Sequence, residues 1–384
     1  EVFKKIAAAQ KQGKPVDGHA PGLRGHDARR YVAAGISTDH ECFTEAEAAE
    51  KLSLGMKILV REGSAARNFD ALVPLLETHA GQMMFCTDDK HPDSLVLGHI
   101  NRLCARAVAY GIDVFKVLQA ACINPVEHYK MNVGQLRPGD PADFVVLSDL
   151  ERFLPLQTWI NGQCCAENGR SLLPQTESAV INNFYSRTLS VADFRLPVSV
   201  KALPVIGALE SQLITEKIHP DPADFIEQEG QLLSNPGKDL LKCFVVNRYG
   251  ETPPAGCFIR HFGLQKGAIA SSVAHDSHNI IVAGLDDEDI CRAVNLLMAS
   301  KGGLSCVSGS EEAVLPLPVG GLMSAGEGYA VAAAYTQIDT MAKSLGCTLQ
   351  APYMTLSFMA LLVIPHIKLS DKGLFDGDAF RFFQ

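Results

Sequence analysis

Four short strand-like stretches of the chain each run into side chains that can bind a metal ion or carry a proton. The groups at their ends are His19, His40, Glu62 and Asp88. The last stretch, residues 83–86, is too short for a helix and leads directly into two adjacent carboxylates, Asp88 and Asp89. Such a run is typical of a buried parallel strand whose carboxyl end lies at a functional site.

The spacing of these groups predicts how they are brought together. They follow one another at intervals of 21, 22 and 26 residues, and each interval contains a helix-like segment. The segments are residues 27–34, 44–54 and 66–79. A strand–helix repeat of this length is that of a β/α barrel, in which functional groups sit at the carboxyl ends of the strands. We therefore expect His19, His40 and Asp88 to face one mouth and to hold metal.

Neutral imidazoles and carboxylates that converge on a divalent ion are the ligands of a metal hydrolase. The ion lowers the pKa of bound water, and a neighbouring aspartate accepts the proton. A single histidine at a strand end is more often structural, but two at consecutive strand ends, with Asp88 at a third, favour metal binding. We expect the Asp89 side chain to cap a backbone segment or to support the metal ligands, rather than to bind metal itself.

Several neighbouring side chains have two interpretations. Arg61 and Glu62 either form an internal ion pair or hold substrate, and Ser64 is a further candidate for substrate binding. Glu41, His91 and His99 could support the metal ligands, but a structural role is favoured for each of them. The cluster of His275, Asp276 and His278 is expected to be a polar turn before a strand; closure of the barrel mouth or a second metal site are the alternatives.

The composition is that of a globular protein with reduced cysteines. Of 384 residues, 47% are apolar and 20% are charged. A formal charge of −9 disfavours nucleic acid and anionic membranes as partners. There is no apolar run long enough to cross a membrane. The eleven cysteines form no Cys-x-x-Cys pair and mostly lie in apolar runs, which indicates free thiols in the cytoplasm.

The fold class expected is α/β, with three parts. Residues 1–131 should form the second half of a TIM-like (β/α)8 barrel, with helices at 99–110, 113–121 and 126–131 after the last strand. Asp113 should cap the second of these helices, and Asn124-Pro125 should interrupt it before the third. Residues 132–177 should form a small β-sandwich module, with a hairpin at Asn161-Gly162. Residues 178–384 should form a C-terminal α+β domain, with strands at 241–247, 279–283 and 303–307 and helices at 287–300 and 327–345. Four strands cannot close a barrel, and half a barrel exposes two unpaired edges. Because the chain also lacks an initiator methionine, we expect preceding sequence or another chain to supply the missing N-terminal half-barrel.

These stretches resemble a known family. Residues 16–23 (VDGHAPGL), 37–41 (STDHE), 61–66 (REGSAA) and 85–89 (FCTDD) look like the motifs of bacterial adenine deaminases, which belong to the amidohydrolase superfamily. The glycine- and aspartate-rich pattern at 134–147 is widespread in that superfamily. Residues 272–279 (SVAHDSHN), 316–324 (PLPVGGLMS) and 355–358 (TLSF) resemble the extra C-terminal domain peculiar to adenine deaminases, so the similarity covers essentially the whole chain.

The resemblance implies hydrolytic deamination of adenine to hypoxanthine and ammonia by metal-activated water. His19 on strand five and His40 on strand six would be metal ligands, and Asp88 on strand eight would be ligand and general base. The metal site would be binuclear, with Mn²⁺ or Fe²⁺ favoured and Zn²⁺ compatible with the ligands. The family's other ligands, a His-x-His and a glutamate, have no counterpart here.

We expect a homo-oligomer. The alternatives are an amidohydrolase acting on another cyclic amine or amide, and a chain that is inactive without its N-terminal half and serves only in assembly.

Overall fold

The computed structural model describes residues 1–174, 176 and 179–383. The chain divides into two compact units. Unit 1 comprises Glu1–Lys90 and Ser94–Thr176, and unit 2 comprises His91–Asp93 and Glu177–Gln384. The expected boundary between residues 177 and 178 falls outside the described residues. Within the described residues, no helix is both long and apolar enough to cross a bilayer.

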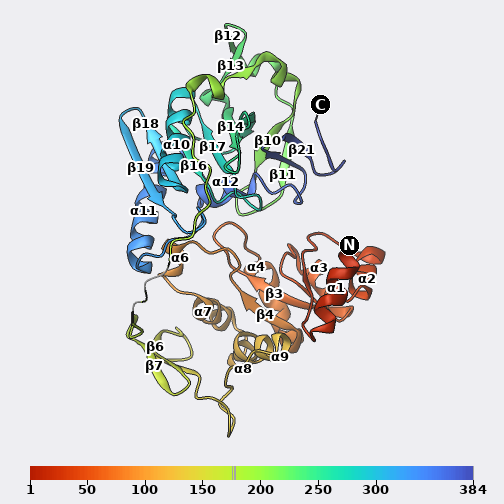
Figure 1. The fold of residues 1–384 in the computed structure, drawn as a ribbon. Coiled ribbons are helices and arrows are strands. Elements are labelled where there is room, and N and C mark those ends of the chain that lie inside the picture. The colour runs from red at the N-terminus through yellow and green to blue at the C-terminus, as the bar shows by residue number, and fades with distance from the viewer. Residues whose placement is uncertain (175, 177–178, 384) are drawn as a thin grey trace. The chain divides into compact units, whose positions relative to one another are not determined.

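Unit 1 is built on a parallel sheet with the strand order β1-β2-β3-β4. Figure 1 labels two of its strands, β3 and β4. The strands are β1 (Asp17–Gly18), β2 (Thr38–Asp39), β3 (Lys57–Arg61) and β4 (Met83–Cys86). Each is followed by a candidate functional residue of the sequence. Since parallel strands end at the same edge of a sheet, this topology gathers those residues at one edge.

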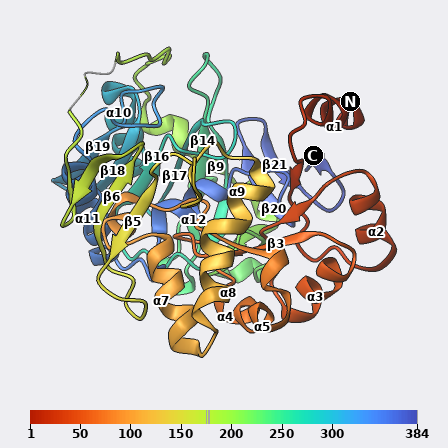
Figure 2. The same cartoon turned by 90° about the horizontal axis from the view of Figure 1, so that it is seen from below.

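Helices separate the strands, as the sequence predicted. They are α2 (Gly25–Ala33), α3 (Glu45–Ser53), α4 (Phe69–Leu72) and α5 (Leu76–His79), with α1 (Val2–Lys11) ahead of β1. The third predicted helix, at 66–79, is broken by a 3₁₀ segment at Val73–Leu75. Pro74 explains the break, because it has no N–H to donate within a helix. Figures 1 and 2 show α3 and α4 beside β3, on which both pack.

After β4 the chain is mainly helical. The elements are α6 (Pro92–Leu95), α7 (Ile100–Tyr110), α8 (Val114–Leu118) and α9 (Asn124–Tyr129). Asp113 caps α8 as predicted, accepting hydrogen bonds from the N–H groups of Phe115 and Lys116. The predicted interruption at Asn124-Pro125 is wrong. A π-helical segment, Gln119–Ile123, joins α8 to α9, and Pro125 lies in the first turn of α9, where its missing N–H is not needed.

The last part of unit 1 is a four-stranded antiparallel sheet in the order β5-β6-β7-β8. Its strands are β5 (Phe144–Leu147), β6 (Pro155–Ile160), β7 (Gln163–Glu167) and β8 (Arg170–Ser171). Asn161 and Gly162 both have positive φ, which confirms the tight hairpin predicted there. The described residues form one sheet here, so the sandwich stays a prediction.

Unit 2 contains an eight-stranded mixed sheet in the order β11-β10-β15-β14-β17-β16-β18-β19. Its strands are β10 (Val205–Ala208), β11 (Thr215–Ile218), β14 (Leu241–Val246), β15 (Ala255–Arg260), β16 (Ala268–Ser271), β17 (Ile280–Gly284), β18 (Gly303–Ser308) and β19 (Glu311–Pro316). The strands predicted at 241–247, 279–283 and 303–307 correspond to β14, β17 and β18. All pairings are antiparallel except that of β10 with β15.

Helices and two small sheets complete unit 2. The helices are α10 (Asp287–Ser300), α11 (Gly328–Ser344) and α12 (Pro352–Phe358). The small sheets are β9 (Leu196–Pro197) with β12 (Ile226–Gln228) and β13 (Gln231–Leu233), and β20 (Ile367–Ser370) with β21 (Gly373–Asp376) and β22 (Arg381–Phe382). Helix α10, predicted at these bounds, packs on β16, β17 and β18 (Figure 1). The Asp286 side chain caps it by accepting from the N–H of Asp289.

A fully buried lysine joins the segments that follow β1 and β2. The Lys51 Nζ of α3 donates to the Asp39 carboxylate at 2.6 Å, to the Glu47 carboxylate at 2.7 Å and to the Ala20 carbonyl at 2.5 Å. Burial alone would raise the pKa of Asp39, but the Lys51 ammonium outweighs it and holds that pKa below its usual value. Lys51 thus fixes the residues next to His19 and His40.

We predict that Lys51→Met lowers the free energy of unfolding by about 3–5 kcal/mol, because two buried carboxylates lose their counter-charge. Denaturant unfolding of the purified protein measures this. Lys116→Met is the matched control: Lys116 pairs with Glu77 on the surface, so its loss should cost less than about 1 kcal/mol. Equal effects of the two substitutions would show that the Lys51 network does not stabilise the fold.

Unit 2 contains a buried lysine, Lys368, that forms no ion pair with a carboxylate of any described residue. Lys368 of β20 is fully buried and donates to the Leu213 carbonyl at 2.6 Å. Burial lowers the pKa of its ammonium to about 7. In the unfolded chain the group keeps its proton to about pH 10.5. The unfolded state therefore binds more protons between these pH values, and the free energy of unfolding rises with pH across that window.

We predict that Lys368→Met is more stable than the wild type by about 3–5 kcal/mol at pH 7, since it removes the cost of neutralising the amine. The difference should shrink as the pH approaches 10. Denaturant unfolding at intervals from pH 7 to 10 measures it, with the exposed Lys372→Met, from the neighbouring turn, as control. A stability difference between Lys368→Met and the wild type that does not change with pH would contradict the lowered pKa of Lys368.

Candidate metal centre

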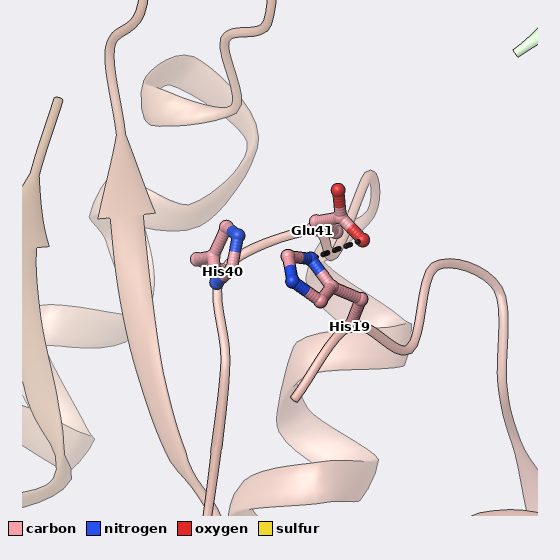
Figure 3. Close-up of side chains that lie close together, drawn as sticks. All are labelled: His19, His40 and Glu41. Atoms are coloured by element: carbon pink, nitrogen blue, oxygen red, sulfur yellow. Dashed lines mark ion pairs between the residues drawn. The ribbon is translucent and has the colours of Figure 1, made fainter. Parts of the chain in front are cut away.

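Two imidazoles and a carboxylate converge beyond the ends of β1 and β2 in unit 1 (Figure 3). One ligand atom from each of His19, His40 and Glu41 lies within 4.8 Å of the others. The rings of His19 and His40 meet edge to face with centroids 4.8 Å apart, and the Nδ1 of His19 lies 3.4 Å from the Oε2 of Glu41. These are ligand types that bind divalent transition metals.

Glu41 is buried although it carries a carboxylate. Its side chain is 4% exposed, against 68% for that of His19. Its Oε2 is inaccessible to water and forms no hydrogen bond with any described residue. A buried carboxylate oxygen in this state is costly unless a cation or a donor compensates it. The oxygen therefore marks the place where a bound cation would be most favourable.

Asp88 adjoins this cluster from the end of β4. Its Oδ2 lies 3.4 Å from the Nε2 of His40 and accepts a hydrogen bond of 2.6 Å from the Nη1 of Arg61. Its backbone has a φ of 52°, in the left-handed region that few residues other than glycine adopt. Such strain is frequent where a side chain must be aimed at a functional site. Asp88, His19 and His40 are thus brought together, as the spacing predicted.

Arg61, at the end of β3, is shared by two acids. Its Nη1 lies 2.6 Å from Asp88 and 3.6 Å from Oε1 of Glu41, and the side chain is 4% exposed. A buried guanidinium between two carboxylates supplies charge to both and limits their movement. The ion pair that the sequence offered between Arg61 and Glu62 is not found among the described residues, because Arg61 pairs with Asp88 and Glu41 and Glu62 pairs with Arg106.

The cluster biases the protonation of its members. The Glu41 carboxylate, 3.4 Å from the Nδ1 of His19, raises the pKa of that imidazole. Burial, and then the Arg61 charge, lower the pKa of His40. Burial would raise the pKa of Asp88, but the Arg61 guanidinium outweighs it and lowers that pKa overall. His40 is therefore a neutral imidazole and Asp88 an ionised carboxylate near pH 7, which are the forms that bind cations.

The other candidates of unit 1 contact neighbours outside the cluster. Glu62 pairs with Arg106 at 2.7 Å, and the Ser64 hydroxyl lies 3.1 Å from that of Ser94. The Asp89 carbonyl accepts from the N–H of Ser64, and the Nε2 of His99 lies 3.0 Å from the Thr87 hydroxyl, one residue before Asp88. Substrate binding by Glu62 and Ser64, and support by Asp89 and His99, stay predictions.

The remaining candidates belong to unit 2. Residues 275–277 form a turn ahead of β17, as the polar-turn interpretation requires. The His275 ring stacks on Phe358 with centroids 4.4 Å apart and lies 5.9 Å from that of His278. His91 packs edge to face on Tyr335 at 4.5 Å, and burial lowers its pKa to about 4. In the described part of the chain, the groups spaced to hold a metal include neither these histidines nor Asp276.

A second group with the spacing of metal ligands is already occupied. It consists of Asp39, Cys42 and Glu47, all buried. The Lys51 ammonium lies among them and bonds both carboxylates. Burial also raises the pKa of the Cys42 thiol far above its usual value, so it is not a thiolate. This group is a structural ion-pair network rather than a metal site.

The sequence favours a structural role for Glu41 and gives no signal for Lys51. It also gives no signal for Asn68, whose side-chain amide bonds the backbone of Arg61, His40 and Cys42. The only available signal was that Glu41 directly follows His40, so that both lie at the end of β2. Nothing in the sequence distinguishes Asn68 from any other loop asparagine.

Comparisons with known proteins agree with this geometry. The amidohydrolase family model matches residues 1–165, and the model of the adenine deaminase C-terminal domain matches residues 212–381. The first match implies a divalent metal. Curated proteins named adenine deaminase align with nearly the whole chain. That of Salinibacter ruber is 50% identical over 99% of this chain and 70% of its own length. That of Methanosarcina mazei is 47% identical over 100% and 71%. A β-aspartyl dipeptidase structure from Fervidobacterium islandicum aligns with 46% of this chain and 52% of its own, at 16% identity and a TM-score of 0.36, too low to support an argument.

We predict that Glu41→Gln weakens Mn²⁺ binding at least about tenfold, the scale of losses seen when groups that support a metal are changed. The reason is that the buried oxygen loses its charge. Equilibrium dialysis of the full natural protein, followed by metal analysis, measures the affinity. Glu50→Gln is the control, because Glu50 pairs with Arg24 at 2.8 Å outside the cluster. Unchanged affinity in the Glu41 variant would remove Glu41 from the site.

Proposed function

Because this chain belongs to the adenine deaminase family, we propose that it acts in the hydrolytic deamination of adenine to hypoxanthine and ammonia. The observation that carries this proposal is the convergence of His19, His40, Glu41 and Asp88 at one edge of a parallel sheet. The substrate in this proposal is inferred from family membership. The catalytic groups in it are the side chains at the edge of the sheet. Neither another cyclic amine or amide nor a purely assembling role is supported by a specific observation.

We propose that the parallel sheet β1–β4 is the second half of a TIM-like barrel, with β1 and β4 as the strands that pair with the other half. The strand order and the intervening helices support this arrangement. The relatives are longer than this chain, which spans about 70% of their length. A preceding half-barrel would complete the ligand set with groups that this chain lacks.

The side chains present fit a divalent cation. One ligand atom from each of His19, His40 and Glu41 lies within 4.8 Å of the others, and one buried oxygen of Glu41 has no hydrogen bond with a described residue. Two carboxylates, of Glu41 and Asp88, share the single guanidinium of Arg61. We propose His19, His40 and Asp88 as ligands, with Glu41 as a further one. A binuclear centre of Mn²⁺ or Fe²⁺, with Zn²⁺ also compatible, is the proposal for the metal. When bound, such a metal lowers the pKa of water and so makes it a nucleophile near neutral pH.

The protein's own groups would handle the protons. Asp88, held ionised by Arg61, would accept the proton that the attacking water releases and return it toward the purine ring or the departing amine. Arg61 would keep that carboxylate in one orientation through the 2.6 Å hydrogen bond. His40 would remain neutral, as its lowered pKa favours. Glu62 and Ser64 remain proposals for contacts with adenine, together with Arg61.

The wider setting is also proposed rather than tested. We propose a homo-oligomer in the cytoplasm, with adenine as the small-molecule partner and with neither nucleic acid nor membrane bound. The cysteines of the chain are free thiols, most of them buried, which suits a reducing compartment.

We predict that Asp88→Asn lowers the rate of ammonia release from adenine by about 10²–10⁴-fold, the usual contribution of a positioned acid or base. Ammonia release by the full natural protein loaded with Mn²⁺ is the measurement, and circular dichroism checks the fold. Asp70→Asn is the control, since Asp70 pairs with Arg106 on the surface. A near-normal rate in the Asp88 variant would refute its role, and a wild type inactive on adenine but active on another purine would refute the substrate.

A further inference from the structure

One buried amide connects the segments that carry the candidate site. Asn68 is 7% exposed. Its Oδ1 accepts a hydrogen bond of 2.6 Å from the backbone N–H of Arg61, and its Nδ2 donates to the carbonyls of His40 and Cys42, each at 3.2 Å. Its own N–H donates to the Arg61 carbonyl at 3.0 Å. The acceptor and both donors of the side chain are therefore in use.

These contacts join the segment that follows β2 to the end of β3. The two carbonyls that Asn68 binds lie on either side of Glu41, so the amide holds the His40–Cys42 segment beyond β2. The bonds to Arg61 hold the end of β3, and the Arg61 guanidinium contacts both Asp88 and Glu41. A single side chain thus connects the two segments between which the cluster forms.

We propose that Asn68 is a positioning residue of the metal centre, which acts through the backbone of residues 40–42 and of Arg61 and touches neither metal nor substrate. The proposal rests on the proposed function of this edge of the sheet and adds to it the group that sets its geometry. Ligands that must converge on one ion tolerate little displacement, because affinity and rate both depend on their relative placement.

The chemistry of the contacts shows why no similar side chain replaces Asn68. An aspartate has nearly the same shape but no N–H groups, so its second oxygen would face two carbonyl oxygens. A serine keeps one oxygen that can accept from Arg61 but cannot reach both carbonyls. Both changes release the backbone of residues 40–42 while leaving the side chain of every proposed ligand unsubstituted.

The chain offers a matched control in Asn124. This asparagine is also buried, and its Nδ2 donates to the carbonyls of Ala80 and Met83 at 2.6 and 2.7 Å. Met83 begins β4, so Asn124 binds the amino end of the sheet, whereas the candidate site lies beyond the carboxyl ends. Asn124→Asp therefore removes the same two N–H donors from a buried side chain of the same unit, but at a place outside the candidate site.

The experiment compares Asn68→Asp, Asn68→Ser and Asn124→Asp in the full natural protein. Thermal unfolding selects a temperature at which all are folded, and Mn²⁺ affinity is then measured by equilibrium dialysis and metal analysis. We expect both Asn68 variants to bind Mn²⁺ at least about tenfold more weakly, and to lose kcat for adenine with little change in KM. Asn124→Asp should keep wild-type affinity and kcat even where its melting temperature falls. If Asn68→Asp does not fold, the serine variant carries the comparison.

Wild-type Mn²⁺ affinity in folded Asn68→Ser, or equal losses in the Asn124 variant, would overturn the proposal. A wild type that binds no Mn²⁺ would overturn it as well, since there would be no centre to position. A wild type that binds Mn²⁺ but releases no ammonia from adenine would instead refute the proposed function. In that case the affinities alone still decide the role of Asn68.

Discussion

Two buried cations allow four carboxylates to lie at the carboxyl ends of one small parallel sheet. Lys51 lies between Asp39 and Glu47, and Arg61 lies between Asp88 and Glu41. Without them, desolvated like charges would repel one another and take up protons. The rest of the site depends on this arrangement, because Arg61 keeps Asp88 ionised and adds to the burial that lowers the pKa of His40.

The two cations have different roles because their geometry differs. Lys51 bonds two carboxylates and a carbonyl, is 1% exposed, and comes from a helix that packs on β3. Each carboxylate oxygen of Asp39 and Glu47 accepts a hydrogen bond, so this group stabilises the fold and leaves no oxygen for a ligand. In the group around Arg61, one oxygen of Glu41 has no hydrogen bond with any described residue. That buried oxygen lies beside two imidazoles, and a divalent ion bound there would compensate it.

The sequence predicts the convergence of His19, His40 and Asp88 because the strand–helix period places successive strand ends at one edge. It also predicts α10 at its observed bounds, since acids at the first turn and an aspartate cap mark its start. It does not predict the burial of Lys51. Glu47 and Lys51 are four residues apart, a spacing usual for exposed helix pairs, and spacing alone does not show which face meets the sheet. The role of Asn68 cannot be predicted from the sequence for a similar reason. Its partners are backbone groups, which every residue has, so no residue type marks them.

A comparison of Asn68 with Asn124 shows how such a sheet is held in register. Short strands of two to five residues provide few ladder hydrogen bonds, so their relative position is weakly determined by pairing alone. Each asparagine adds two side-chain hydrogen bonds to carbonyls at one end of the sheet, at the carboxyl ends for Asn68 and at the amino end of β4 for Asn124. Buried amides suit this task because they carry no charge that would disturb the neighbouring acids. Asn68 can therefore fix the backbone positions of the proposed ligands without changing the charge balance that Arg61 maintains beside them. A metal centre needs both properties, because it must attract a cation and also hold its ligands in place.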